Sequence, residues 1–261
     1  EDFGTQGSAP SHPELLDWLA VEFMARDWDM KAIQKLIVTS ATYRQRSHAT
    51  AAALEKDPEN VLCARGPRFR MEAEMIRDTA LGAAGLLNRK IGGPSVMPYQ
   101  PEGVWNSPYS GERWVNATND ERFRRGIYVF LKRTSPYPSF QALDSTSRES
   151  CTVRRIRTNT PLQALALLND PVYMEAARGL AQRVQMKPTK EGKAILLFRL
   201  CTGRTPSDAE RQRLLELVAT LDRRYTLASS EALTLAGSKE LAVWTMVANV
   251  VLNLDETLTK G

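Results

Sequence analysis

The sequence predicts a mainly α-helical protein, organised as a multi-helix domain with a long ordered Pro/Gly-rich loop and a minor β-strand or hairpin. Apolar side chains recur at helical spacing through most of the chain. Sequences typical of helix starts precede several of these segments. Only residues 127–131 combine β-branched and aromatic side chains in a short apolar run, which is typical of a strand. With 261 residues, of which 43% are hydrophobic, the chain can bury a core.

The first section, residues 1–64, predicts two helices. The string SHPE at residues 11–14 has the form of a capping box with proline near the helix start. A helix should therefore run over 13–25, where leucine and aromatic side chains recur at helical spacing. Asp29 can cap a second helix that runs to about residue 44. We expect the two helices to form an antiparallel pair that buries two apolar stripes.

The second section, residues 65–157, predicts one helix, the long loop and the strand. A strongly basic segment, 65–70, leads into a helix over 71–87. Residues 92–122 are rich in Pro, Gly, Asn and Ser, which predicts a long ordered loop. Aromatic residues in this loop would suit stacking on a sugar face, or they would plug a small core. These aromatic residues are Trp105, Tyr109 and Trp114.

The third section, residues 158–261, predicts only helices. Thr160 begins a second capping-box sequence, so a short helix should run over 161–168. Asp170 and Pro171 can cap and start a helix that continues to about residue 184. Further helices are expected over 190–200 and 240–254, and Thr205 and Pro206 begin a third with the same kind of start, which runs to about residue 224. The sum is seven or eight helices, and we expect the three sections to form one continuous domain.

The net charge of +5 is unevenly distributed. Residues 1–64 carry 6 basic and 10 acidic side chains, residues 65–157 carry 16 and 9, and residues 158–261 carry 13 and 11. The second section is thus +7, between −4 before it and +2 after it. Such a positive section suits an anionic partner, such as a sulfated or carboxylated glycan, a phosphate ester, nucleic acid or an acidic protein surface. The alternative is that its charges are solvated or paired internally.

Composition argues against several classes of protein. Cys63, Cys151 and Cys201 are isolated from one another, without a CxxC or CxxCH motif, and only two histidines occur. We therefore expect no metal site and no covalently bound haem in this chain. No apolar run reaches the roughly 18 residues that span a bilayer, so the most apolar stretch, 241–254, should be a core helix. The chain begins at Glu1 without a Met or a signal peptide, so we expect an excised fragment of a larger protein or a processed product.

The segment 144–171 concentrates the polar side chains that would form a site. Helix amino ends attract anions, and arginines add bidentate donors for carboxylate, sulfate or phosphate groups. The alternative is that the arginines pair with local acids while Thr160 and Asp170 only cap helices. The candidate ligand-binding residues, which include one arginine of the basic segment 65–70, are Arg70, Asp144, Cys151, Arg154, Arg155, Asn159, Thr160 and Gln163.

No catalytic motif accompanies these candidates. The sequence lacks GxSxG, P-loop and HExxH strings, so catalytic residues stay unassigned. Cys151 precedes two arginines, which favour a reactive thiolate, but a lone buried cysteine is the commoner case and neither histidine is spaced as its partner. Glu72 and Glu74 are two residues apart on the expected helix and so point in different directions. They do not form a carboxylate dyad.

Four strings in order along the chain resemble a known family. They are EDFGTQG at residues 1–7, SHPELLDWLA at 11–20, LIVTSATYRQ at 36–45 and TNTPLQALALLNDP at 158–171. The chain resembles the planctomycete-type domain of unknown function, DUF1553, which is usually found at the C-terminal end of proteins with cytochrome c-like domains. The resemblance implies an exported multidomain protein, so an extracytoplasmic location, periplasmic or at the cell surface, is expected. It also implies that haem c belongs only to an upstream domain, since no haem-attachment motif occurs here.

These observations leave two functional hypotheses of different kinds. The first is an accessory or binding domain for an anionic glycan or for a neighbouring domain, whose partners include the upstream cytochrome c-like and companion domains. The second is an enzyme that acts on an anionic polysaccharide or ester through carboxylates and arginines of residues 65–78 and 144–170. Nucleic-acid binding is the weakest reading, because no recognisable DNA-reading motif accompanies the charge.

Overall fold

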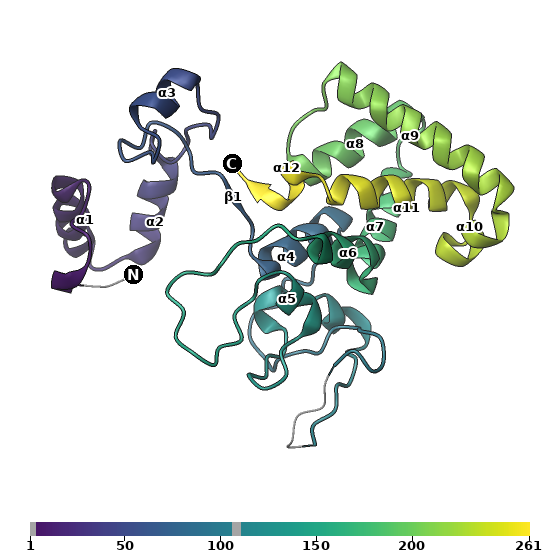
Figure 1. Cartoon of the computed structure of the whole chain (residues 1–261), viewed down its shortest axis with the longest axis horizontal. Helices are drawn as coiled ribbons and strands as arrows, with labels where there is room; N and C mark the ends of the chain where they lie inside the picture. Colours follow the sequence, from purple (N-terminus) through teal and green to yellow (C-terminus); the bar gives the residue numbers. More distant parts are fainter. Residues whose placement is uncertain (1–3, 106–110) are drawn as a thin grey trace. The chain divides into compact units, whose positions relative to one another are not determined.

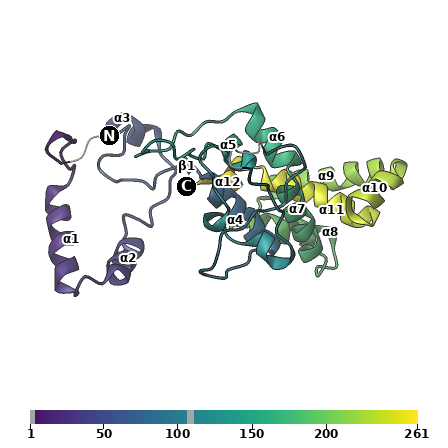
Figure 2. The same cartoon turned by 90° about the horizontal axis from the view of Figure 1, so that it is seen from below.

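The computed structural model describes residues 4–105 and 111–261, and it confirms the mainly helical fold class. Twelve α-helices and one two-stranded antiparallel sheet, which pairs β1 with β2, occur in these residues (Figures 1 and 2). The elements are α1 (Pro13–Ala25), α2 (Met30–Thr39), α3 (Ala51–Lys56), β1 (Phe69–Arg70), α4 (Ala73–Ala84), α5 (Pro138–Ala142), α6 (Pro161–Asn169), α7 (Pro171–Val184), α8 (Lys190–Thr202), α9 (Asp208–Leu227), α10 (Ser229–Ala236), α11 (Lys239–Leu252), α12 (Asp255–Leu258) and β2 (Thr259–Lys260).

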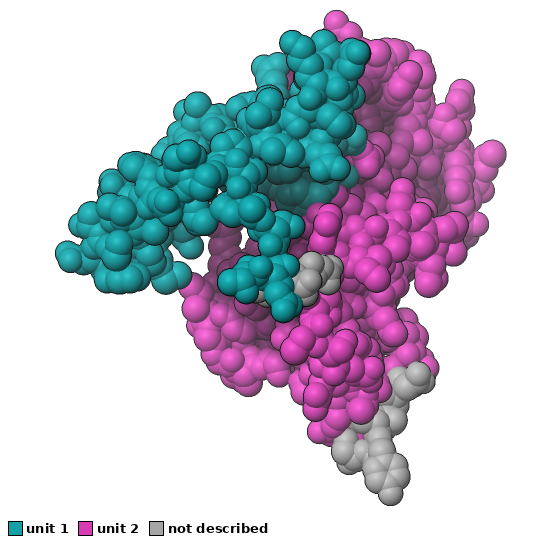
Figure 3. Space-filling view, turned by 60° about the vertical axis from the view of Figure 1, so that its left-hand side comes forward, with its two compact units in different colours: residues 1–69, 259–261 teal, residues 70–258 magenta. Residues whose placement is uncertain are grey.

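The chain divides into two compact units, which Figure 3 colours separately. Unit 1 comprises residues 1–69 and 259–261, and unit 2 comprises residues 70–258. Unit 1 contains α1, α2 and α3, whereas unit 2 contains the helices from α4 to α12.

Unit 1 begins with the two helices that the sequence predicts. α1 has the expected bounds, but its predicted capping box is wrong. His12, not Ser11, occupies the N-cap, its side chain makes no hydrogen bond to the first turn, and Ser11 Oγ lies 3.0 Å from His12 Nδ1. Asp29 does cap α2, since its carboxylate accepts from Lys31 N and Ala32 N. α2 ends at Thr39, earlier than predicted. No residue of α1, α2 or α3 is buried.

Unit 2 is built around α7 and α11. α7 packs against α4, α6, α8 and α11, while α11 also packs against α8, α9 and α10 (Figure 1). Trp244 on α11 is the largest fully buried side chain, and it shares the core with Leu180 of α7 and Leu197 of α8. The most apolar stretch of the sequence is therefore a core helix, as expected. Burial of these side chains is the main stabilisation of unit 2.

The predicted caps of α6 and α7 form in unit 2, but the capping box predicted for α6 is incomplete because the Gln163 side chain bonds to Asp144 and Thr158. Thr160 accepts from Gln163 N at the start of α6, and Asp170 accepts from Val172 N at the start of α7. At α9 the complete capping box lies at Ser207 and Glu210, two residues after the predicted Thr205. These bonds satisfy backbone amides that have no partner within the first helical turn.

The segment 126–131 is not the predicted strand. Gly126–Tyr128 forms one turn of 3₁₀-helix, and Val129 makes only an isolated bridge to Val96. A Cβ at Gly126 would lie 2.8 Å from Glu74 Cα, so the segment lies directly against the first turn of α4. This contact takes the place of a strand partner.

The described part of the long loop is packed by its aromatic residues. Trp114 stacks on Tyr137 at 5.2 Å between ring centroids, and it lies 5.5 Å from Trp105. Trp105 Nε1 donates to Ser135 O, and Trp114 Nε1 donates to Pro98 O. These two tryptophans therefore fill a small core of the loop. Tyr109, the third predicted stacking residue, lies outside the described residues.

Candidate functional site

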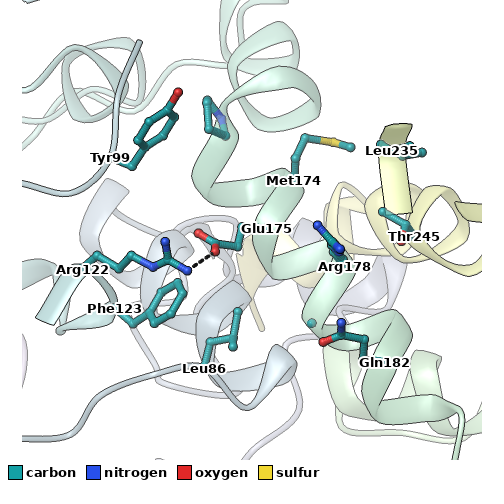
Figure 4. A pocket seen from close by; sticks show the side chains of 12 residues that line it. Leu86, Tyr99, Arg122, Phe123, Met174, Glu175, Arg178, Gln182, Leu235 and Thr245 are labelled. Carbon is teal, nitrogen blue, oxygen red and sulfur yellow. Dashed lines mark hydrogen bonds and ion pairs between the residues drawn. The ribbon is translucent and has the colours of Figure 1, made fainter. Parts of the chain in front are cut away.

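A cleft of about 600 Å3 runs along α7 in unit 2 (Figure 4). α7 supplies one wall, residues of the loop before α5 supply the other, and α10 and α11 contribute at one end. The lining residues are Leu86, Tyr99, Arg122, Phe123, Pro171, Met174, Glu175, Arg178, Gly179, Gln182, Leu235 and Thr245. We name this cavity the α7 cleft.

The sequence of α7 explains why this face is open. Met174, Arg178 and Gln182 are spaced four residues apart, so they lie on one face of the helix. Tyr173 and Leu180 lie on the other face and are buried in the core. The helix is thus amphipathic, with its polar face along the cleft.

A glycine brings the floor of the cleft close to α7. A Cβ at Gly179 would lie 3.0 Å from a methyl carbon of Leu86 and 3.3 Å from Ala84. The absence of a side chain therefore lets Leu86 pack directly on the helix. Phe123 and Met174 extend this apolar surface.

One ion pair crosses the cleft. Arg122 Nη2 donates to Glu175 Oε1 at 2.6 Å, and the Arg122 guanidinium also lies 4.6 Å from the centroid of the Phe123 ring. Arg77, which is almost fully buried, holds this segment in place by donating to the backbone oxygens of Arg122 and Arg124. Burial lowers the pKa of the Arg77 guanidinium.

Arg178 differs from Arg122 because it has no partner. It is exposed on the cleft, and no hydrogen bond or ion pair joins its side chain to any of residues 4–105 and 111–261. The side chain of Gln182, one turn further along α7, is likewise unpaired within the same described ranges. Tyr99 leaves 45% of its surface exposed at the rim. The cleft thus offers a free cation, an amide and an aromatic ring above an apolar floor.

A second cavity of about 350 Å3 lies at the start of α4, also within unit 2. Its charged lining comes from both segments that the sequence singled out, namely Glu72 and Glu74 from one and Arg148 and Arg155 from the other. Arg155 makes a bidentate pair with Glu74 at 2.6 and 3.1 Å, and its Nη1 lies 3.4 Å from Glu72. The hydrogen bonds that Arg155 donates to Glu74 raise the pKa of the Arg155 guanidinium. This cluster is largely neutralised by its own members.

The predicted site residues fall into several hydrogen-bonded groups, although Arg70, Asp144 and Arg155 together line a small cavity of about 10 Å3. Asp144 and Gln163 meet in one hydrogen-bond network, because the Asp144 carboxylate accepts from Gln163 Nε2 and from the backbone and hydroxyl of Thr158. Arg70 Nη1 lies 3.5 Å from Asn159 Oδ1. Arg155 pairs at α4, as described above, and Thr160 caps α6.

Two candidates remain apart from these groups. Cys151 and Arg154 are both exposed, and neither side chain has a hydrogen-bond or ion-pair partner in the described part of the chain. The structure therefore does not gather the eight candidates into one pocket. It holds the ends of the loop 145–157 together through Asp144 and Thr158, and Arg155, near the end of this loop, attaches it to Glu74.

The α7 cleft was not among the sequence candidates. Glu175, Arg178 and Gln182 look like the solvated face of any amphipathic helix, which is the commoner role for such residues. A weak signal existed in Gly179, since a glycine inside a helical pattern often marks close packing.

The described residues form neither a metal-ion cluster nor a single membrane-spanning helix. Among them, no three His, Cys, Asp or Glu side chains lie close enough to hold a metal ion. No single helix in these ranges is long and apolar enough to cross a membrane, although α10 and α11 together have that length and composition, with a 70° bend between them.

The fold and cavities define a mainly helical domain with an open, cationic cleft. Its sequence places it more closely: the chain belongs to the PSD1 family, described as proteins of unknown function (DUF1553), whose family model matches residues 1–218. This match confirms the resemblance inferred from the four strings. No curated protein and no solved structure matches the chain.

Proposed function

We propose that this DUF1553 domain is a binding module that holds an anionic saccharide in the α7 cleft. The observation that carries the proposal is the unpaired guanidinium of Arg178 (Figure 4). A guanidinium presents its N–H donors in a planar fork that matches carboxylate and sulfate oxygens. A cation without a partner on a concave surface is available to an acidic ligand.

The other polar groups of the cleft suit a sugar rather than a bare anion. Sugars have apolar faces that stack on aromatic rings and hydroxyls that need hydrogen-bond partners. Tyr99 offers the exposed ring. Gln182 and the second carboxylate oxygen of Glu175 have no partner among the described residues, so both can bond to hydroxyls.

Electrostatics favour the same class of ligand. The two arginines and one glutamate of the cleft sum to +1, and the second section of the sequence carries +7. A net positive field increases the encounter rate of an anionic ligand at low ionic strength. An acidic surface of a neighbouring domain is the other occupant that this charge would suit.

The family context extends the proposal beyond the cleft. In this reading the domain is an accessory part of an exported polypeptide, and haem c is carried by an upstream domain of the same protein. The ligand would then be met outside the cytoplasm. This extension rests on the resemblance of the sequence and not on the geometry of the cleft.

A titration with acidic oligosaccharides tests the proposal. Uronic-acid and sulfated oligosaccharides should bind the chain, and Arg178→Ala should weaken binding by about tenfold or more, because a charge-assisted bidentate contact is lost. Arg213→Ala is the matched control, since Arg213 is exposed on α9 and lies away from the cleft. Isothermal titration calorimetry measures both. Absence of binding, or equal losses in the two variants, would rule out the cleft as the site.

The alternative function is an enzyme that acts on an anionic polysaccharide or ester. The observation in its favour is the second cavity, which two glutamates and two arginines line together. If it is catalytic, product should form from an acidic polysaccharide or ester, and Glu72→Gln should abolish it. Glu72 is the relevant residue because Glu74 is already bidentately paired with Arg155.

A further inference from the structure

The helix α1 carries an apolar surface that nothing in unit 1 covers. Its large hydrophobic side chains are about half exposed, and none of its residues is buried. Leu15, Trp18, Val21 and Met24 recur every third residue, which is one of the ridges by which helices pack against other helices. Such a ridge on a helix that lacks a buried face is typical of an interaction surface.

α2 adds to this surface. Met30, Ile37 and Val38 are each between 40 and 65% exposed, and α2 likewise has no buried residue. We refer to the exposed apolar side chains of α1 and α2 together as the α1–α2 surface.

The side chains of α1 and α2 carry charges of opposite sign, and most of these charges are unpaired within the described residues. α1 carries Glu14, Asp17 and Glu22 without a basic residue, and α2 carries Lys31 and Lys35 without an acidic one. Glu22 pairs with Arg26, just beyond the end of α1. The other four form no ion pair within residues 4–105 and 111–261.

We propose that a second copy of this chain covers the α1–α2 surface. In a two-fold dimer each contact occurs twice, so the acidic α1 of one copy can lie on the basic α2 of its partner while α2 lies on the partner's α1. The apolar ridges then bury one another, and all four helices form one bundle. The opposite charges of α1 and α2 make the surface complementary to itself, as an isologous interface requires.

A membrane surface satisfies these observations less well. Anionic lipid headgroups attract basic segments and repel acidic ones. The three acidic residues of α1 lie on the same helix as its most exposed apolar side chains. A second copy offers positive charge to α1 and negative charge to α2, whereas a lipid surface offers only one sign.

The oligomeric state in solution tests this proposal directly. Light scattering coupled to size exclusion should give twice the monomer mass at about 0.1 mM, where even micromolar dimers are formed. Trp18→Glu should give the monomer mass. Leu227→Glu, the same kind of change at a side chain that is 91% exposed at the end of α9 in unit 2, should leave the dimer intact.

Reversing the charges of α1 or of α2 distinguishes loss of a specific interface from misfolding of unit 1. Glu14→Lys/Asp17→Lys and Lys31→Glu/Lys35→Glu should each be monomeric, because both place like charges on facing helices. Mixing the two variants should restore a dimer that contains one copy of each, since opposite charges then meet at both contacts. A wild-type monomer, or a mixture that stays monomeric, overturns the proposal. A monomer that floats with anionic vesicles would assign the surface to a membrane instead.

Discussion

The helices of unit 1 and unit 2 are built from similar side chains, yet only those of unit 2 bury them. α1 and α11 both contain Leu, Val, Trp and Ala, but α11 has nine buried residues and α1 has none. The difference lies in the neighbours, because α11 packs against α7, α8, α9 and α10, whereas among the described elements α1 packs mainly against α2. Helical periodicity thus predicts that a helix forms, whereas the number of helices that pack against it determines whether its apolar face is buried.

The largest difference between the two units should appear when a tryptophan is truncated. Trp244→Ala should destabilise unit 2 by about 3–5 kcal/mol, because the side chain is 1% exposed and its loss leaves a cavity. Trp18→Ala should change the unfolding transition of unit 2 by less than about 0.5 kcal/mol, because Trp18 belongs to unit 1 and is half exposed. Urea denaturation followed by far-UV circular dichroism measures both. Equal losses would show that α1 contributes to the core of unit 2.

A smaller difference in the free energy of unfolding is expected between two arginine variants, one in each unit. Arg77→Met should cost about 2–3 kcal/mol, since it leaves the backbone oxygens of Arg122 and Arg124 without their donor. Arg26→Met in unit 1 should cost less than about 0.5 kcal/mol, because its pair with Glu22 is exposed. Urea denaturation followed by far-UV circular dichroism measures both changes in the free energy of unfolding. A small effect at Arg77 would mean that water replaces its guanidinium.

Helix caps should differ by about 1 kcal/mol. Thr160→Ala removes the acceptor of Gln163 N at the start of α6 and should destabilise unit 2 by that amount. Ser11→Ala should have almost no effect, because Ser11 does not cap α1. Midpoints of thermal unfolding would separate the two variants. A clear loss at Ser11 would indicate that the capping box forms in solution.

The smallest contrast concerns cysteine reactivity. Burial raises the pKa of the Cys201 thiol in unit 2 to about 12, so this thiol stays protonated and unreactive at pH 8. Cys63 in unit 1 is only half-buried, and Cys151 is exposed. A chromogenic disulfide reagent should therefore titrate Cys151 first, Cys63 next and Cys201 only after unfolding. Rapid labelling of all three would show that the core around Cys201 opens easily.

Much of the fold could be predicted from local signals. The bounds of α1 and α7 agree with the predicted ones, because proline and cap residues mark where each helix begins. The short helices α3, α5, α10 and α12 were missed, since a helix of one or two turns shows little periodicity. The strand predicted over 127–131 is wrong for a different reason. The segment packs against α4, and among the described residues only an isolated bridge at Val96, too short to be a strand, lies beside it.

The candidate sites were harder to predict. The grouping of Asp144 with Gln163 depends on a turn in which Asp144 has a φ of 62°, a conformation that composition does not reveal. The pairing of Arg155 with Glu74 joins residues 81 positions apart in the chain. The α7 cleft arises because the loop containing Tyr99 and Arg122 lies across α7. Such long-range contacts have no counterpart in local sequence patterns.

The hydrogen bond that closes unit 2 has a consequence for how this unit can be rearranged. Met71 N donates to Leu258 O at 2.9 Å, so the chain enters unit 2 and leaves it at neighbouring points. A segment with adjoining ends can be spliced into a loop of an unrelated host, or its ends can be linked and new termini opened elsewhere. The exposed turn after α8, at Gly203, is a suitable place for such termini. Unit 2 is thus suited to circular permutation and to transplantation as a single insert.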